Sequence, residues 1–114
     1  TGLMWARCDL GQTWNGFTCE DTPFVLSWFE AFQTASEHDL GNHNDWLLPN
    51  IKELATLLAL EESRLSSDDI GYWSSTPYSP DSQKAWMLNS DKGTTIPDST
   101  LTLKRVRLVR KRID

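Results

Sequence analysis

The chain has 114 residues, of which 39% are hydrophobic and 24% are charged, with a formal net charge of −5. This length suits one domain with a single core, and no apolar run reaches the ~18 residues of a membrane span. Basic side chains gather near the end of the chain, whereas the rest is acidic. Nucleic-acid binding needs a continuous basic face, so we expect no nucleic-acid partner. The lack of a long apolar run means that we expect no membrane insertion either. We expect the basic end to pair with the carboxylates of the rest of the chain.

The first motif is CDLGQTWNGFTC at residues 8–19. Its Asn15-Gly16 pair is typical of a two-residue hairpin, because a type I′ turn needs positive φ at both central positions. Such a hairpin would bring Cys8 and Cys19 together, so we predict a disulfide that stabilises the fold by ~2–3 kcal/mol. A disulfide indicates an oxidising compartment. Two cysteines alone supply half a structural zinc site, so no metal is expected there.

Two amphipathic helices are predicted after the hairpin. Each begins with a capping box, in which a polar side chain caps the first turn and a glutamate bonds back to it: Ser27 with Glu30, and Asn50 with Glu53. Gly41 is expected to end the first helix. The side chains predicted to form the apolar faces are Phe29, Phe32 and Ala35 in the first helix and Ile51, Leu54, Leu57 and Leu58 in the second.

Strands and turns are predicted for the remainder. Residues 71–74 and 85–89 are strand candidates, residues 91–93 form a turn, and a polar loop runs on through Pro97. The alternating segment 102–110 is predicted to be the last strand.

The segment GYWSSTPY at 71–78 allows three interpretations: a nucleophile site, a sugar-stacking surface, or a strand that runs into a loop. A nucleophilic Ser74 or Ser75 would need a base and a sharp glycine-flanked turn, and the segment has neither. Strand alternation would place one of Tyr72 and Trp73 in the core and the other on the loop side. The strand is therefore favoured, and ligand stacking is the alternative.

The two histidines lie among acidic residues, which raises the question of a metal site. His38 is expected at a helix C-terminus, where an imidazolium is favourable, and His43 in a polar loop, so we predict a solvated surface. Calcium is not expected, because Asn50 of the LPN tripeptide is a helix cap and the IPD tripeptide at 96–98 lacks neighbouring carboxylates. No cofactor is predicted.

Five motifs carry a resemblance to a known family. They are TGLMW at 1–5, DWLLPNIKEL at 45–54, YWSSTPY at 72–78, AWMLNSDKG at 85–93 and RVRLVR at 105–110. In order and approximate spacing they resemble the Lcl C-terminal domain family, a group of bacterial envelope or secreted domains named from a collagen-like adhesin. The resemblance covers nearly the whole chain.

The resemblance implies an α+β domain with a C-type-lectin-like fold. We expect two helices flanking a small antiparallel sheet, paired N- and C-terminal strands and long loops, in one domain over residues 1–114 of a longer protein. Formylglycine-generating sulfatase modifiers are distant relatives that present a cysteine pair to substrate. Cys8 and Cys19 are expected to be joined to each other instead, so we predict that the domain is not an enzyme.

One position departs from the family pattern. The second motif is DWRLP in the family, whereas Leu47 stands here in place of the arginine. Any ligand contact or ion pair of that arginine is therefore not carried over. The neighbouring Asp45 and Glu53 are expected to pair with Arg107 and Arg110.

The function favoured is a non-catalytic, adhesin-like binding module of a secreted, periplasmic or cell-surface protein. Its partner would be a glycan, a glycosaminoglycan or a cell-surface protein, and an oligomer is left open. The alternative is a structural or protein-interaction domain with no small-ligand site. Retention on a glycan array or a heparin column distinguishes the two.

Two surfaces compete as the binding site. The favoured one comprises the polar loops outside the motifs, at 79–84 and 91–101, with an aromatic face for sugar stacking. Its candidate residues are Trp14, Tyr78, Asp81, Gln83, Lys84, Asp91, Lys92 and Asp98. The other is a basic patch that would bind sulfated polysaccharide through charge, formed by Lys104, Arg105, Lys111 and Arg112.

Overall fold

The computed structural model describes residues 3–37, 45–61, 70–90 and 92–111. These residues form two helices and three small antiparallel sheets, so the predicted α+β class is confirmed, while the C-type-lectin-like topology stays a prediction. In chain order the elements are β1 (Leu3–Trp5), β2 (Thr13–Trp14), β3 (Cys19–Glu20), α1 (Trp28–Ser36), α2 (Ile51–Glu61), β4 (Tyr72–Pro77), β5 (Lys84–Asn89), β6 (Thr94–Ser99) and β7 (Val109–Lys111).

The largest sheet has the strand order β4-β5-β6, so β5 lies in its centre. β5 and β6 pair without interruption from Lys84 opposite Ser99 to Asn89 opposite Thr94. The predicted polar loop through Pro97 is therefore wrong, because these residues form a strand. Pro97 is tolerated because β6 lies at the edge of the sheet, where an absent N–H breaks no second ladder.

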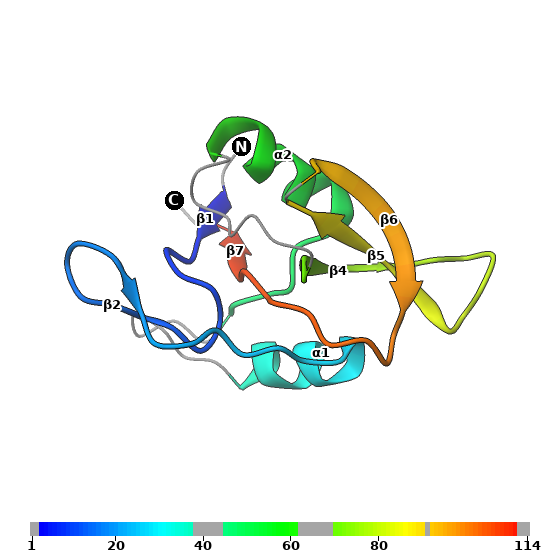
Figure 1. Cartoon of the computed structure of the whole chain (residues 1–114), viewed down its shortest axis with the longest axis horizontal. Coiled ribbons are helices and arrows are strands. Elements are labelled where there is room, and N and C mark those ends of the chain that lie inside the picture. Colours follow the sequence, from blue (N-terminus) through cyan, green and yellow to red (C-terminus); the bar gives the residue numbers. More distant parts are fainter. Residues whose placement is uncertain (1–2, 38–44, 62–69, 91, 112–114) are drawn as a thin grey trace.

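Both faces of this sheet are covered. Tyr72 and Trp73 are neighbours on β4 and point to opposite faces, yet both are fully buried. Trp73 packs in a core with Ala31 and Ala35 of α1, whereas Tyr72 packs in a second core with Leu54 and Leu57 of α2. Figure 1 shows α1 and α2 on opposite sides of the sheet. The prediction that one ring faces the loop side is therefore wrong, since each face has its own helix.

Helix α1 begins as predicted, because Ser27 and Glu30 form the capping box. It ends at Ser36, before Gly41, and Gly41 lies outside the described residues. Its buried side chains are the alanines Ala31 and Ala35, which let the helix approach Trp73 closely. The predicted apolar face is therefore correct for Ala35 and wrong for two rings, which lie on the exposed flank beside Trp28: Phe29 and Phe32.

Helix α2 agrees with its prediction. Glu53 Oε1 accepts from the Asn50 N–H at 2.9 Å, and Asn50 Oδ1 accepts from the Glu53 N–H at 2.8 Å, which completes the second capping box. Leu54 and Leu57 are buried, and Ile51 and Leu58 are half-buried.

The terminal strands pair as expected, with Leu3 opposite Lys111 and Trp5 opposite Val109. The predicted strand over 102–110 is only partly right, because regular pairing is confined to Val109–Lys111. Before that, the chain exchanges backbone bonds with several segments in turn, at Leu26, Gly71, Trp73, Leu10 and Ala6. It crosses the middle of the molecule and therefore cannot alternate between buried and exposed positions. No described helix has the length and apolar character of a membrane span.

Candidate functional site

The basic segment 104–110 lies inside the protein. Lys104, Arg105, Arg107 and Arg110 retain only 4, 9, 3 and 9% of their exposure. Buried charges of this kind persist only when they are paired. The prediction that the basic end pairs with the body's carboxylates is confirmed for these residues, because all four lie within 4.0 Å of an acidic side chain.

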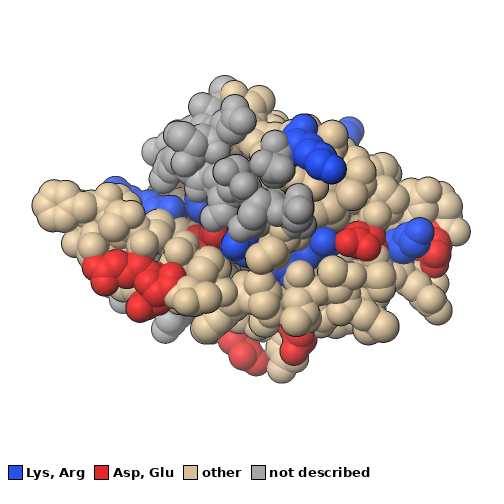
Figure 2. All heavy atoms as spheres, viewed as in Figure 1, with Lys and Arg blue, Asp and Glu red and all other residues tan. Residues whose placement is uncertain are grey.

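The predicted basic patch is consequently wrong. Two of its four members, Lys104 and Arg105, are buried and cannot form a charged surface. The side chain of Lys111 and the whole of Arg112 lie outside the described residues. In Figure 2 the Lys and Arg atoms on the face shown are scattered, with acidic atoms between them, and form no continuous patch.

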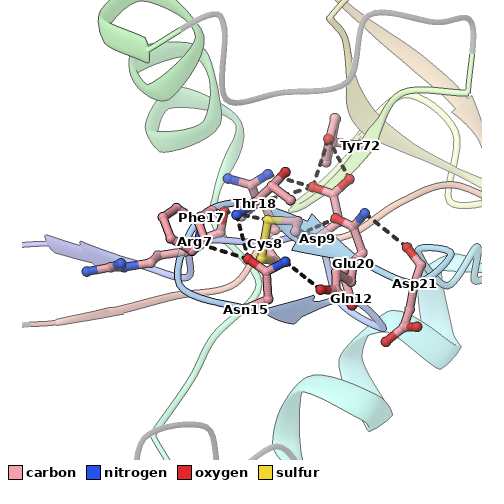
Figure 3. Close-up of a disulfide and its surroundings, with 12 residues drawn as sticks. Arg7, Cys8, Asp9, Gln12, Asn15, Phe17, Thr18, Glu20, Asp21 and Tyr72 are labelled. Atoms are coloured by element: carbon pink, nitrogen blue, oxygen red, sulfur yellow. Dashed lines mark hydrogen bonds and ion pairs between the residues drawn. A yellow bond between two sulfur atoms is a disulfide. The ribbon is translucent and has the colours of Figure 1, made fainter.

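Asp9 is the centre of the buried charges. Its Oδ1 accepts from Arg107 Nη2 at 2.7 Å and Nε at 3.1 Å, and the Tyr72 hydroxyl lies 2.8 and 2.9 Å from the two carboxylate oxygens. Arg105 Nε lies 3.9 Å from Oδ2. Figure 3 shows the Tyr72 hydroxyl pointing at this carboxylate. Sequence reasoning missed Asp9, although an acidic residue between Cys8 and Leu10 in a short apolar stretch was a signal of burial.

The predicted partners of the arginines are half correct. Arg110 does bind Asp45, with Nε and Nη2 at 2.7 and 3.0 Å from the two carboxylate oxygens. Arg107 binds Asp9 in place of Glu53, because Glu53 is held at the start of α2 by its capping bond.

Asp98 and Lys104 come from the two competing predicted sites and are bound to each other. Lys104 Nζ lies 2.9 Å from Asp98 Oδ2, 3.3 Å from the Ile70 carbonyl and 5.5 Å from the centre of the Trp73 ring. Burial acts to raise the pKa of Asp98, but the hydrogen bond from Lys104, a bond from the Ser99 N–H and the nearby ammonium charges together lower it. The pair therefore closes β6 onto the C-terminal segment and is not free to bind a ligand through its charges.

This lowered pKa predicts an acid-sensitive contribution to stability. Since the folded-state pKa of Asp98 is below its ordinary value of about 3.9, the contribution is present above that pH and is lost as the pH falls through the lowered value. Asp98→Asn should destabilise the domain at pH 7 and much less at pH 2. Thermal unfolding of both proteins at the two pH values measures this, and an equal difference at both would contradict it.

The loop between β4 and β5 brings four other predicted residues together: Tyr78, Asp81, Gln83 and Lys84. Asp81 Oδ1 accepts from the Gln83 N–H at 3.0 Å, and the Lys84 N–H donates to the Asp81 carbonyl at 3.0 Å. The Tyr78 ring packs edge-on against Trp86, with 5.6 Å between ring centres. The Asp81 carboxylate and several backbone groups are thus used to hold the shape of this loop, whereas the Gln83 and Lys84 side chains are exposed.

The other predicted residues lie elsewhere. Asp98 pairs with Ala85 near this loop, whereas Lys92 follows the opposite end of β5. Asp91 lies outside the described residues, as do His38 and His43. Trp14 belongs to β2, which lies at the far end of the molecule's long axis from the β4–β5 connection (Figure 1). The structure therefore separates Trp14 from the predicted polar loops.

A cleft of about 550 Å³ lies beside Trp14. We call it the tryptophan cleft. It lies between the segment after β1 and the β2–β3 hairpin, and its larger lining side chains are those of Trp5, Arg7, Gln12, Thr13, Trp14 and Trp46, of which Trp46 is buried. The Arg7 guanidinium carbon lies 5.0 Å from the centre of the Trp14 ring, within the range of a cation–π contact. The cleft thus combines flat apolar rings with hydrogen-bonding groups.

The predicted disulfide and hairpin are both confirmed. Cys8 is bonded to Cys19, and β2 pairs with β3. The bond joins the cleft-lining segment to the second strand of the hairpin that carries Trp14 (Figure 3).

The turn of this hairpin differs from the prediction. It has four residues, 15–18, and only Gly16 among them has a positive φ, of 99°. Asn15 Oδ1 accepts from the N–H groups of both Phe17 and Thr18 at 2.8 Å. The Asn15 side chain thus holds an open loop, as Asn side chains commonly do in turns, and the type I′ turn is wrong.

Comparison with protein families matches residues 1–110 to the Lcl C-terminal domain. The chain belongs to the Lcl C-terminal domain family. No curated protein matches it in sequence.

Leu47 of this Lcl C-terminal domain lies at a second cavity, of about 440 Å³. It is 50% exposed in the wall, near Glu53 and Arg110. This apolar side chain therefore stands at a solvent-facing position, beside an arginine that Asp45 neutralises.

The hydroxyls of the YWSSTPY motif serve the backbone of the Lcl C-terminal domain. The Ser74 hydroxyl is fully buried, donates to the Trp86 carbonyl at 2.6 Å and accepts from the Thr76 N–H at 3.2 Å. The structural interpretation of this motif is confirmed. Within the part of the chain that the structure describes, no three His, Cys, Asp or Glu side chains gather in a way that could hold a metal ion.

Proposed function

We propose that this domain is a non-catalytic binding module that recognises carbohydrate in the tryptophan cleft. The observation that carries the proposal is the exposed Trp14 ring beside Arg7 at the wall of one cleft, with the half-buried Trp5 and the buried Trp46 forming its apolar floor. Its volume of about 550 Å³ lies within the range typical of small-ligand sites. The indole ring of Trp14 offers a flat apolar face for a sugar ring, and the Arg7 and Thr13 side chains offer hydrogen bonds to hydroxyl groups.

The same cleft is favoured over the two surfaces predicted from sequence. In the β4–β5 loop, Asp81 is engaged in internal hydrogen bonds. On β6, Asp98 is paired with Lys104. In the predicted basic patch, Lys104 and Arg105 are buried in the interior. Of the predicted ligand residues, Trp14 is the one that lies at the wall of a cleft, and it is 41% exposed.

The proposal extends to where the protein acts. Membership of a family of bacterial envelope or secreted domains, together with a disulfide, supports a secreted, periplasmic or cell-surface location, since disulfides persist in oxidising compartments. In that setting a glycan ligand would belong to a surface or matrix that the parent protein contacts.

Replacing Trp14 with alanine tests the site. Loss of a stacking ring is expected to weaken binding of neutral oligosaccharides about tenfold or more, since ~1.4 kcal/mol corresponds to a factor of ten. Affinity is measured on a neutral-glycan array and then by calorimetry on the best hit. Binding should change little between low and high salt, because the contacts are not between opposite charges.

Two matched variants serve as controls. Phe17→Ala removes an aromatic ring from the same hairpin that is 91% exposed and does not line the cleft, and Tyr78→Ala removes one from the competing loop. Both should bind like the parent. Unchanged binding by Trp14→Ala, together with a loss in Tyr78→Ala, would place the ligand at the loop instead.

The alternative of a protein-interaction domain has an observation of its own. Phe29 and Phe32 of α1 are 63 and 39% exposed, and both rings pack edge-on against Trp28, so they lie together on one flank of the helix. Exposed apolar groups of this size are typical of contact surfaces when they are contiguous. A protein that is retained by no neutral or sulfated glycan would favour this alternative.

A further inference from the structure

The β2–β3 hairpin is an appendage of the core. Residues 13–18 are all exposed, and neither hydrophobic core contains any residue between Leu10 and Leu26. The base of this loop is closed by a backbone bond of 2.8 Å from the Phe24 N–H to the Leu10 carbonyl. Everything beyond that bond, including Trp14, stands outside the packed interior.

The strand side of the cleft is, in contrast, fixed by the core. The Ala6 N–H donates to the Leu108 carbonyl at 2.9 Å, and the Leu10 N–H donates to the Val106 carbonyl at 2.8 Å. Between these two bonds lies the buried carboxylate of Asp9. Cys8 therefore sits in a segment that needs no disulfide to stay in place.

Few contacts join the hairpin to that segment. Among the described residues they are the Cys8–Cys19 bond, the approach of Arg7 to the Trp14 ring, hydrogen bonds of the Gln12 side chain to Asp9 and Asp21, both 3.2 Å long, and a backbone bond of 3.0 Å from Gln12 to Asp9. Figure 3 shows the disulfide between the hairpin and the Asp9 segment. The covalent bond is the strongest of these links and the only one that redox chemistry can break.

We propose that the Cys8–Cys19 disulfide is a redox-sensitive tether that fixes Trp14 in the wall of the tryptophan cleft. Reduction releases the hairpin and opens the cleft, while the core stays folded. The effect on ligand rests on the proposed function, whereas the release of the hairpin does not. The domain would then bind its carbohydrate ligand in oxidising surroundings and release it where dithiols are available.

The chemistry is a thiol–disulfide exchange with a protein dithiol of the thioredoxin class. One thiolate attacks Cys19, the more exposed of the pair, forming a mixed disulfide and expelling Cys8 as a thiolate, which takes up a proton. The second thiol of the reductant then attacks the mixed disulfide. Cys8 and Cys19 end as thiols, and the reductant ends as a disulfide after a transfer of two electrons.

The test compares the oxidised protein, the protein reduced with a dithiol, and the Cys8→Ser/Cys19→Ser variant. Amide hydrogen exchange measures the opening of residues 13–20, and thermal unfolding measures the stability of the core. The affinity for the neutral oligosaccharide selected on the array reports the state of the cleft. Reduction and the double variant should both speed exchange in the hairpin about tenfold or more. They should leave cooperative unfolding in place and weaken oligosaccharide binding about tenfold.

Two results would contradict the tether. One is hairpin exchange that is unchanged by reduction. The other is loss of cooperative unfolding on reduction, which would mean that the disulfide is needed for the whole fold. Trp14→Ala is the control, since it keeps the disulfide and a slowly exchanging hairpin while losing the ring. If the oxidised parent binds no oligosaccharide, the proposed function fails, and the exchange measurement alone still decides the tether.

Discussion

Replacing Asp9 with asparagine is expected to destabilise the domain by about 3–5 kcal/mol. The side chain is almost fully buried and is bonded to Arg107 and to the Tyr72 hydroxyl, with Arg105 nearby. Without its charge, two buried guanidinium groups would lose the carboxylate that they share at this point, and less of the cost of keeping them out of water would be offset. Since small domains are stable by only ~5–15 kcal/mol, this one change should remove a large part of the total.

Urea unfolding measures the loss, as a lower midpoint with an unchanged slope. Asp21→Asn is the matched control, because Asp21 is exposed, lies on the same stretch of chain and has a φ of 71° that asparagine also tolerates. It should unfold like the parent. If Asp9→Asn also unfolds like the parent, the buried charge network does not stabilise the fold.

Removing residues 105–114 is expected to abolish cooperative folding. The deletion takes away β7 and with it the buried side chains of Val106, Leu108 and Val109. Each such side chain contributes ~1.5–3 kcal/mol, and Asp9 would also lose both arginines. The sum is comparable with the whole stability of a small domain.

Circular dichroism during heating is the measurement, and the truncated protein should show no cooperative transition. A shorter truncation that ends at Lys111 keeps β7 and should melt like the full chain. A sharp transition in the longer truncation would mean that the C-terminal segment is a dispensable tail.

Local features of this fold could be predicted because their causes lie close together in the sequence. The capping boxes of Ser27 and Asn50 were right, since each depends on residues three positions apart. The prediction of a hairpin was right as well, because the short polar segment between the two strands reverses the direction of the chain. Its turn type was wrong, because the Asn15 side chain satisfies two backbone N–H groups that the expected turn would have arranged differently.

Long-range features could not be predicted from pattern alone. Tyr72 and Trp73 alternate as strand residues should, but alternation cannot reveal that a helix covers each face of the sheet. The charges of Lys104 and Arg105 suggest a solvated surface, and only the position of Asp9 and Asp98 in three dimensions explains their burial.

One residue of the candidate site was predicted from the sequence. Trp14 was identified as an aromatic face for sugar stacking, and the structure places it in the wall of the tryptophan cleft. Arg7, Trp5 and Trp46 were missed. Trp5 and Arg7 belong to one stretch of the chain and Trp46 to another, and both tryptophans lie in family motifs, which were interpreted as determinants of the fold.

The pairing of β1 with β7 also determines how the domain responds to mechanical force. Leu3 and Lys111 lie directly opposite each other, so tension between the two ends peels the strands apart one residue pair at a time and does not shear all their hydrogen bonds together. The third pair to separate is Trp5 with Val109, and Trp5 is part of the cleft wall. Tension that passes through this domain would therefore reach the cleft and the core beneath α2 at the same residue pair, because Trp5 also packs against that core.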